Sequence, residues 1–294
     1  MEHKNKESLI KGITYCIIAH LMLAIMGACA KYLAEFHHII EIIFYRNTAI
    51  FIALALFIVI TRKKSILHTH QPKLTAARGI LGIIGLFFTF SAIAMLPIAY
   101  ATVIFFTSSI LTPILAFVFL KENIRIHHWS AIAIGMCGVL IIAQPSGAIS
   151  LTGLIFGLLA ACIHGFMFTI LRGLKKQNAI TTTFYFILLG TVLPGFAMPW
   201  VWNTIASEHI WIFALTALSG GIGQLCLANA YKHAPAVVVT PFGYSALIWT
   251  ILIDIFIWHY TLDYFAIFAG TALILVAQLY IVYQESKHQY RNQT

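Results

Sequence analysis

Two charged side chains interrupt long apolar stretches, where a charge needs a partner. Arg46 lies in "EIIFYRNTAIFIALALFIVI" (41–60), and Asp254 lies in "ILIDIFIW". A charge at the centre of a bilayer costs about 2.5–3.5 kcal/mol on insertion scales, so it usually faces protein or a water-filled cavity. The fork of Arg46 suits a carboxylate or phosphate, although snorkelling toward headgroups is an alternative. We predict that Asp254 pairs with Arg46 or titrates, with a protonated aspartate of no further role as the alternative.

Histidines could add proton chemistry to the same apolar segments. His20 and His164 each lie in the middle of an apolar run. Imidazole titrates near neutrality, so both are candidates for proton coupling, with a hydrogen-bonded structural role as the alternative.

Uncharged polar and aromatic residues mark a second set of candidates. Such groups can hydrogen-bond a polar ligand or simply tie helices together. With Arg46, the substrate-binding candidates are Thr107, Ser108, Gln224, Asn229, Tyr244, Ser245 and Trp249.

The motifs of several enzyme classes are missing from the sequence. The five cysteines are scattered singly, and "HTH" (68–70) and "HH" (127–128) lack the further ligand of a good metal site. No GxxxxGK[ST] loop is present, and no Ser/His/Asp or paired-carboxylate constellation has a credible spacing. We therefore predict a protein that is not an enzyme and has no metal or cofactor.

The composition requires lipid around much of the chain. Of 294 residues, 61% are hydrophobic and 9% are charged, and the mean hydropathy is +0.91. A soluble domain has roughly a quarter of its residues charged. The sequence therefore predicts an all-α integral membrane protein, with residues 12 onward retained as a first span rather than removed as a signal peptide.

Ten segments are long and apolar enough to cross a bilayer, whose core needs about 20 helical residues. The predicted spans are 12–33, 40–60, 74–95, 98–120, 127–143, 151–171, 181–200, 210–231, 235–257 and 263–283.

The basic residues orient these spans. Ten spans place both termini on one side, and all lysines and arginines except Lys31 and Arg46, which makes sixteen of the 18, then fall on that side. By the positive-inside rule both termini are cytoplasmic. The net charge of +9 is thus explained by topology, Arg78 included, and not by nucleic-acid binding.

An internal repeat divides the chain into two halves of five spans. "GIIGLFFTFSAIAMLP" (82–97) matches "GGIGQLCLANAYKHAP" (220–235) at an offset of 138, and "FYR" (44–46) corresponds to "FYF" (184–186). An odd number of spans per half inverts the second copy. Inverted repeats, here 12–143 and 151–283, are typical of alternating-access transporters with a binding site between the halves.

The stretch "YATVIFFTSSILTPILAFVFLKENIRIHHWSAIAIGMCGVLII" (100–142) resembles EamA-type members of the drug/metabolite transporter superfamily. The resemblance covers nearly the whole chain, including Arg46 early in the second span. It implies a ten-helix inner-membrane carrier of small organic solutes and makes Glu122, in "FLKE", a gate candidate. The second half departs from the pattern, because "IFIWHYTLDY" has His259 where an acidic residue is expected.

These observations predict a secondary active transporter of a small organic metabolite. An amino acid or an amino-acid- or nucleoside-like derivative such as S-adenosylmethionine fits a fixed cation beside aromatic and hydroxyl groups. The alternative is a proton-coupled exporter of drugs or amphipathic metabolites, and a channel or membrane enzyme is less favoured. The expected partners are the substrate, protons and the lipid bilayer, but no nucleic acid; a homodimer is left open.

Overall fold

The computed structural model describes residues 2–62, 64–108, 150–174, 177, 179–233, 240–260 and 263–291, with single residues and pairs between 111 and 141. Every regular element in these ranges is a helix. The first group is α1 (Glu2–Leu33), α2 (Ile39–Thr61), η1 (Lys64–Leu67), α3 (Pro72–Met95) and α4 (Ile98–Phe106). The second is α7 (Leu151–Gly173), α8 (Ala179–Val201), α9 (Ser207–His233), η2 (Thr240–Tyr244), α11 (Ser245–Phe256) and α12 (Tyr264–Arg291).

The described helices agree with the predicted spans. α1, α2, α3, α7, α8, α9 and α12 each cover one of them, and α4 and α11 lie within the fourth and ninth. α3 ends before Pro97, where the missing N–H and fixed φ of proline make continuation unfavourable. Most of the fifth predicted span lies outside the described residues.

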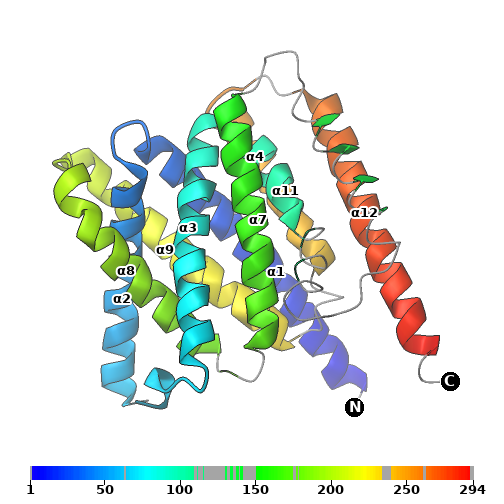
Figure 1. The fold of residues 1–294 in the computed structure, drawn as a ribbon, viewed down its shortest axis with the longest axis horizontal. Coiled ribbons are helices and arrows are strands. Elements are labelled where there is room, and N and C mark those ends of the chain that lie inside the picture. Colours follow the sequence, from blue (N-terminus) through cyan, green and yellow to red (C-terminus); the bar gives the residue numbers. More distant parts are fainter. Residues whose placement is uncertain are drawn as a thin grey trace.

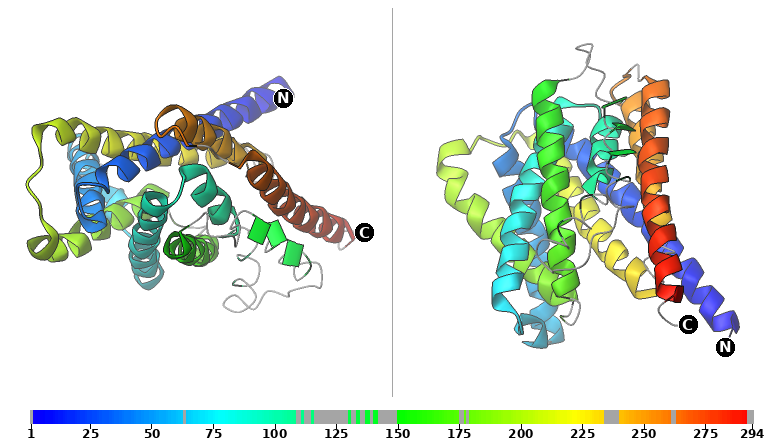
Figure 2. Two further views of the ribbon diagram at one scale, coloured as in Figure 1. Left: turned by 90° about the horizontal axis from the view of Figure 1, so that it is seen from above. Right: turned by 45° about the vertical axis from the view of Figure 1, so that its right-hand side comes forward.

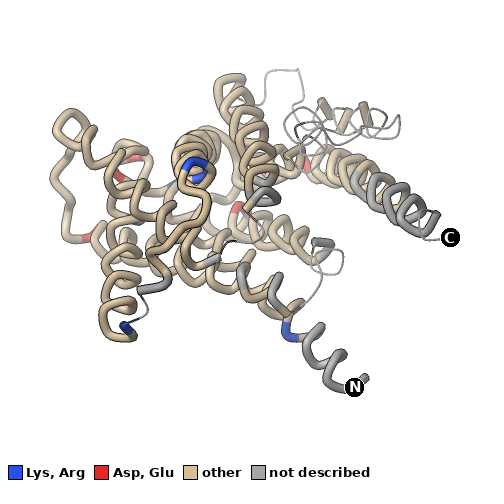
Figure 3. Tube along the Cα trace, turned by 60° about the horizontal axis from the view of Figure 1, so that its bottom comes forward, with Lys and Arg blue, Asp and Glu red and all other residues tan. Residues whose placement is uncertain are grey.

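Length and composition identify five of the described helices as able to cross a membrane: Ile10–Leu33, Ile39–Thr61, Pro72–Met95, Ile180–Val201 and Ser207–Leu227. Three shorter apolar helices are Leu151–Met167, Phe242–Phe256 and Tyr264–Ala277. Figure 3 shows that most of the described chain carries no acidic or basic residue. Large apolar side chains such as Phe196, Phe265 and Ile60 are exposed, as expected of surfaces that face lipid. The chain is a multi-pass membrane protein.

Each of the first four α-helices packs beside a helix of the second group. α1 lies along α9, α2 along α8, α3 along α7, and α4 against α11 (Figures 1 and 2). The helices of one group thus pair with those of the other in reverse order for the first three. α12 lies at the edge of the bundle against α4 (Figure 1). The interior is built from apolar contacts such as those of Phe90, Ile42 and Ile212 between α3, α2 and α9.

Candidate functional site

A cavity of about 440 Å³ lies among these paired helices. Its described lining residues come mainly from α1, α2, α3, α4, α7, α8, α9, η2 and α11, and none of these residues is an aspartate or glutamate. A cavity of this size suits a small metabolite.

Six of the residues singled out in the sequence line the cavity together: His20, Arg46, Ser108, His164, Gln224 and Tyr244. Tyr244 and Phe106 form an aromatic wall, with ring centroids 4.9 Å apart and an edge-to-face angle of 83°. Five other candidates do not line it: Thr107, Asn229, Ser245, Trp249 and Asp254. Asn229 donates to the carbonyl of Leu225 within its own helix, so this hydrogen bond does not join two helices. Glu122 lies outside the described residues.

Arg46 is almost completely buried, with 2% of its surface exposed. Its Nε donates to Met26 Sδ at 3.2 Å and its Nη1 to Asn47 Oδ1 at 3.1 Å. Both acceptors are neutral. Within the described residues, no carboxylate is close enough to form an ion pair with this guanidinium. Arg46 therefore does not snorkel to the surface but lies buried at the cavity, with no counter-charge from the described residues.

Gly220 of α9 makes the room that Arg46 occupies. A Cβ at Gly220 would lie 2.8 Å from Arg46 Nε and 2.9 Å from Met26 Sδ, whereas a Cβ at the adjacent Gly221 would meet its nearest atom, Ile50 Cγ1, at 3.6 Å. The first two separations are too short for a methyl group, and the third is ordinary contact.

We expect Gly220→Ala to lower the stability of the protein by about 1–3 kcal/mol, because overpacking forces buried neighbours out of place. Gly221→Ala is the matched control and should change stability by less than about 0.5 kcal/mol. Thermal unfolding of the purified variants in detergent measures both. Equal melting temperatures for the two variants would show that Arg46 moves aside without loss.

Arg78 is a charged residue of the cavity wall that was not singled out from the sequence. Its place near the start of α3 made it look like a helix-end topological charge, but the side chain is 8% exposed and lines the cavity. Its guanidinium carbon lies 4.6 Å from the centre of the Phe186 ring. Nε and Nη1 are buried without a hydrogen-bond partner among the described residues. The topological assignment of Arg78 was therefore incomplete. The sequence feature that accompanies Arg78 is Gly82, a glycine one helical turn further along α3. In the structure, a Cβ at Gly82 would lie 2.9 Å from Arg78 Nη1.

The two cavity histidines have local hydrogen-bond partners. His20 Nδ1 donates to the carbonyl of Cys16 at 2.8 Å. His164 Nε2 lies 3.4 Å from Thr89 Oγ1, and that hydroxyl donates to the Gly85 carbonyl at 2.7 Å. Because the hydroxyl proton is used, His164 Nε2 acts as the donor to Thr89. The proton-coupling role of both histidines stays a prediction.

Asp254 has a different partner from the one predicted. Its carboxylate accepts from the backbone N–H groups of Ile98, at 3.0 Å, and Ala99, at 2.7 Å. These amides begin α4, where Pro97 at the N-cap supplies no side-chain acceptor. The free amides and the helix dipole favour a carboxylate at this position. The predicted pair with Arg46 is not formed, because Asp254 caps α4 from α11 instead.

Lys31 completes this junction from the opposite side. Its Nζ donates to the carbonyls of Ile93, at 2.8 Å, and Leu96, at the end of α3. It also lies 5.7 Å from the centre of the Trp258 ring and interacts electrostatically with Asp254. The break between α3 and α4 is thus held by a buried cation on its carbonyls and a buried anion on its amides.

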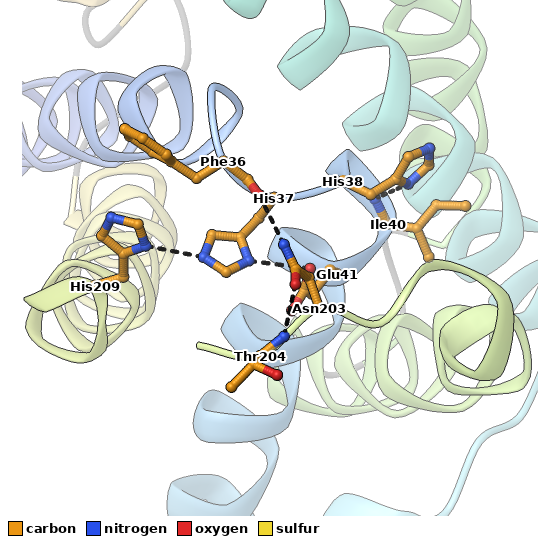
Figure 4. Close-up of polar contacts among 8 residues, drawn as sticks. All are labelled: Phe36, His37, His38, Ile40, Glu41, Asn203, Thr204 and His209. Carbon is orange, nitrogen blue, oxygen red and sulfur yellow. Dashed lines mark hydrogen bonds and ion pairs between the residues drawn. The ribbon is translucent and has the colours of Figure 1, made fainter. Parts of the chain in front are cut away.

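A second buried polar group joins the turn between α1 and α2 to the start of α9 (Figure 4). His37 Nδ1 lies 3.1 Å from Glu41 Oε2, and His37 Nε2 lies 3.0 Å from His209 Nδ1. We call His37, Glu41 and His209 the turn cluster. All three are buried, and Glu41 Oε1 has no hydrogen-bond partner among the described residues. None of these three residues was singled out from the sequence, in which 172 residues separate the two histidines.

Comparison with known proteins agrees with the architecture. The chain is 27% identical over 289 residues to an uncharacterized transporter of Helicobacter pylori strain J99, covering 94% of this chain and 96% of that protein. It is 26% identical to an S-adenosylmethionine uptake transporter of Rickettsia bellii, covering 94% of both chains. It is also 26% identical to the pseudopaline exporter CntI of Pseudomonas aeruginosa PAO1, covering 92% of this chain and 95% of that one.

Among the solved structures that share the fold is a crystal structure with a TM-score of 0.62 at 16% identity; the match covers 96% of this chain and 98% of that one. The EamA-like transporter family matches residues 10–144 and again residues 151–283. Nearly the whole chain is therefore accounted for by one family of membrane transporters, which points away from an enzyme. The chain belongs to the EamA-like transporter family.

Proposed function

We propose that the protein is a secondary active transporter that moves a small metabolite bearing a carboxylate across the inner membrane. An amino acid or an amino-acid-like derivative is the favoured substrate class. The observation that carries this proposal is the buried guanidinium of Arg46 at the wall of a cavity of about 440 Å³, where no described residue supplies a counter-charge. Arginine binds carboxylates with two parallel hydrogen bonds, and a desolvated arginine without an anion is unfavourable.

Alternating access would follow from two inverted five-span halves, 12–143 and 151–283. The reverse-order pairing of α1, α2 and α3 with α9, α8 and α7 supports this arrangement. So do two matched contacts: Gly220 faces Arg46, and its repeat counterpart Gly82 faces Phe186, the counterpart of Arg46. The family match to each half separately is further support. Rocking one half against the other would expose the cavity to each side in turn.

Both termini would lie in the cytoplasm. The support is the bias of lysines and arginines toward one side. The start of α1 and the end of α12 also lie at the same end of the molecule (Figure 1).

The names of the relatives widen the range of substrates to be tested. One is an uptake transporter for S-adenosylmethionine and another is an exporter of pseudopaline. The two names differ in direction as well as in solute, so neither import nor export follows for this chain.

Counterflow in proteoliposomes tests the proposal. Vesicles loaded with unlabelled amino acids or S-adenosylmethionine should accumulate the labelled solute transiently and saturably, as only a carrier does. Arg46→Ala should raise the KM for the accepted solute by about 10–100-fold, the equivalent of about 1.5–3 kcal/mol for a charge-assisted hydrogen bond. Arg62→Gln is the matched control, because Arg62 follows the same helix but is exposed. Uptake that is linear in concentration and shows no counterflow would contradict the carrier mechanism.

A further inference from the structure

The charge balance of the cavity restricts its ligand. Arg46 and Arg78 both line it, and the lining residues that the structure describes include no aspartate or glutamate. Among the described residues, neither guanidinium has a carboxylate within ion-pair distance. Two permanent cations therefore share a largely apolar space without a counter-charge from these residues. A ligand that neutralises both must itself carry about two negative charges.

Arg78 is prepared to receive an anion. The Phe186 ring lies 4.6 Å from its guanidinium carbon, and Gly82 allows this close packing, since a Cβ there would lie 2.7 Å from the ring and 2.9 Å from Nη1. The side chain is more than nine-tenths buried, yet Nε and Nη1 have no acceptor in the described structure. Buried donors without partners are rare and costly, so each needs an explanation. Nε and Nη1 lie on different edges of the guanidinium, so a ligand carboxylate would accept from one of them together with the adjacent Nη2.

The two arginines belong to different helices of the cavity wall. Arg46 is near the start of α2 and Arg78 is near the start of α3, and these two consecutive helices run in opposite directions (Figure 1). Different helices also flank them: Met26 of α1 contacts Arg46, whereas Phe186 of α8 contacts Arg78. Two acidic groups joined by a carbon skeleton would give each arginine an acceptor of its own.

We propose that the cavity binds an organic anion with two separate acidic groups, one held by Arg46 and the other by Arg78. This rests on the proposed carrier function and gives its substrate class: dicarboxylates, amino dicarboxylates and their N-substituted derivatives. The aromatic wall of Phe106 and Tyr244 then contacts the apolar part of the ligand. S-adenosylmethionine has one carboxylate, an ammonium and a sulfonium. Its net positive charge would add to the two cations of the cavity instead of neutralising them.

The test compares ligands that differ by one acidic group. Purified protein is titrated with glutamate and glutamine, with succinate, glutarate and adipate and their monomethyl esters, and with S-adenosylmethionine, and thermal stabilisation gives each Kd. We expect at least one diacid to bind about tenfold or more tightly than its monoacid partner. Arg78→Gln should remove this preference and leave the monoacid affinity within about threefold.

Two controls protect the result. Lys73→Gln removes a cation from the same helix at an exposed position and should keep the preference. Arg78→Lys keeps the charge without the fork and should retain part of it. The diacid proposal is overturned if S-adenosylmethionine or the monoacids bind as tightly as every diacid, or if no diacid stabilises the protein. It is also overturned if Arg78→Gln leaves the preference intact. Counterflow of a monoacid or of S-adenosylmethionine would sustain the carrier function while rejecting this substrate class.

Discussion

Replacing Asp254 with alanine is expected to destabilise the protein by about 3–5 kcal/mol, because it leaves a buried charge and two buried amides without their partner. The carboxylate is fully buried, accepts from two backbone N–H groups at the start of α4, and interacts electrostatically with the buried Lys31. The apparent melting temperature in detergent should fall by about 6 °C or more. Asp254→Asn keeps an oxygen acceptor and should lose less.

Two further measurements separate this capping role from proton coupling. In a double-mutant cycle, Lys31→Met and Asp254→Asn should show a coupling of at least about 0.5 kcal/mol, since both side chains act on the break between α3 and α4. Transport by Asp254→Asn should keep the pH profile of the unmodified protein. A shifted profile with unchanged stability would instead assign Asp254 to proton coupling, as the sequence analysis allowed.

Loss of the turn cluster is the second large effect. Glu41→Ala should cost about 1.5–3 kcal/mol, because hydrogen bonds to a charged group contribute about that much and the loss leaves His37 buried without its acceptor. Removing His209 should cost less, since the hydrogen bond between His37 and Glu41 at 3.1 Å remains. Melting temperatures in detergent measure both.

The chain contains a matched control for this experiment. Glu35 lies in the same turn and is exposed, so Glu35→Ala should change stability by less than about 0.5 kcal/mol. If Glu35→Ala and Glu41→Ala melt together, the turn cluster does not hold the start of α9 to the turn between α1 and α2. The geometry allows one proton between His37 Nε2 and His209 Nδ1, 3.0 Å apart.

Much of the site was accessible from the sequence because a charge in an apolar run has few explanations. Arg46 was singled out this way and lies at the cavity, as do His20, His164, Gln224 and Tyr244. Asp254 was singled out by the same reasoning, but its burial serves the start of α4 instead. A charged residue in an apolar segment was thus correctly expected to be buried in both cases. The same reasoning did not tell whether the buried charge lines a cavity or caps a helix.

Arg78 was not recognised as a cavity residue, because its neighbours in sequence resemble an ordinary helix end. Position along the chain locates a residue along a helix, but which side of the helix faces the cavity depends on the helices packed around it. Phe186, which covers the Arg78 guanidinium, follows it by more than a hundred residues and arrives on α8. The same limit hid the turn cluster, whose histidines lie 172 residues apart.

The sequence by itself determined that the chain is helical, lies in a membrane and belongs with small-molecule transporters. Hydropathy and the order of motifs can both be read from the sequence without knowing which residues are neighbours in space. Only the tertiary structure decided which buried charges share a cavity, because that depends on α2 packing on α8, α3 on α7 and α1 on α9. It separated Arg46 and Arg78, which line the cavity, from Lys31 and Asp254, which hold a helix break. The physical reason is that a buried charge is stabilised by whatever the fold brings against it, and sequence spacing does not record those neighbours.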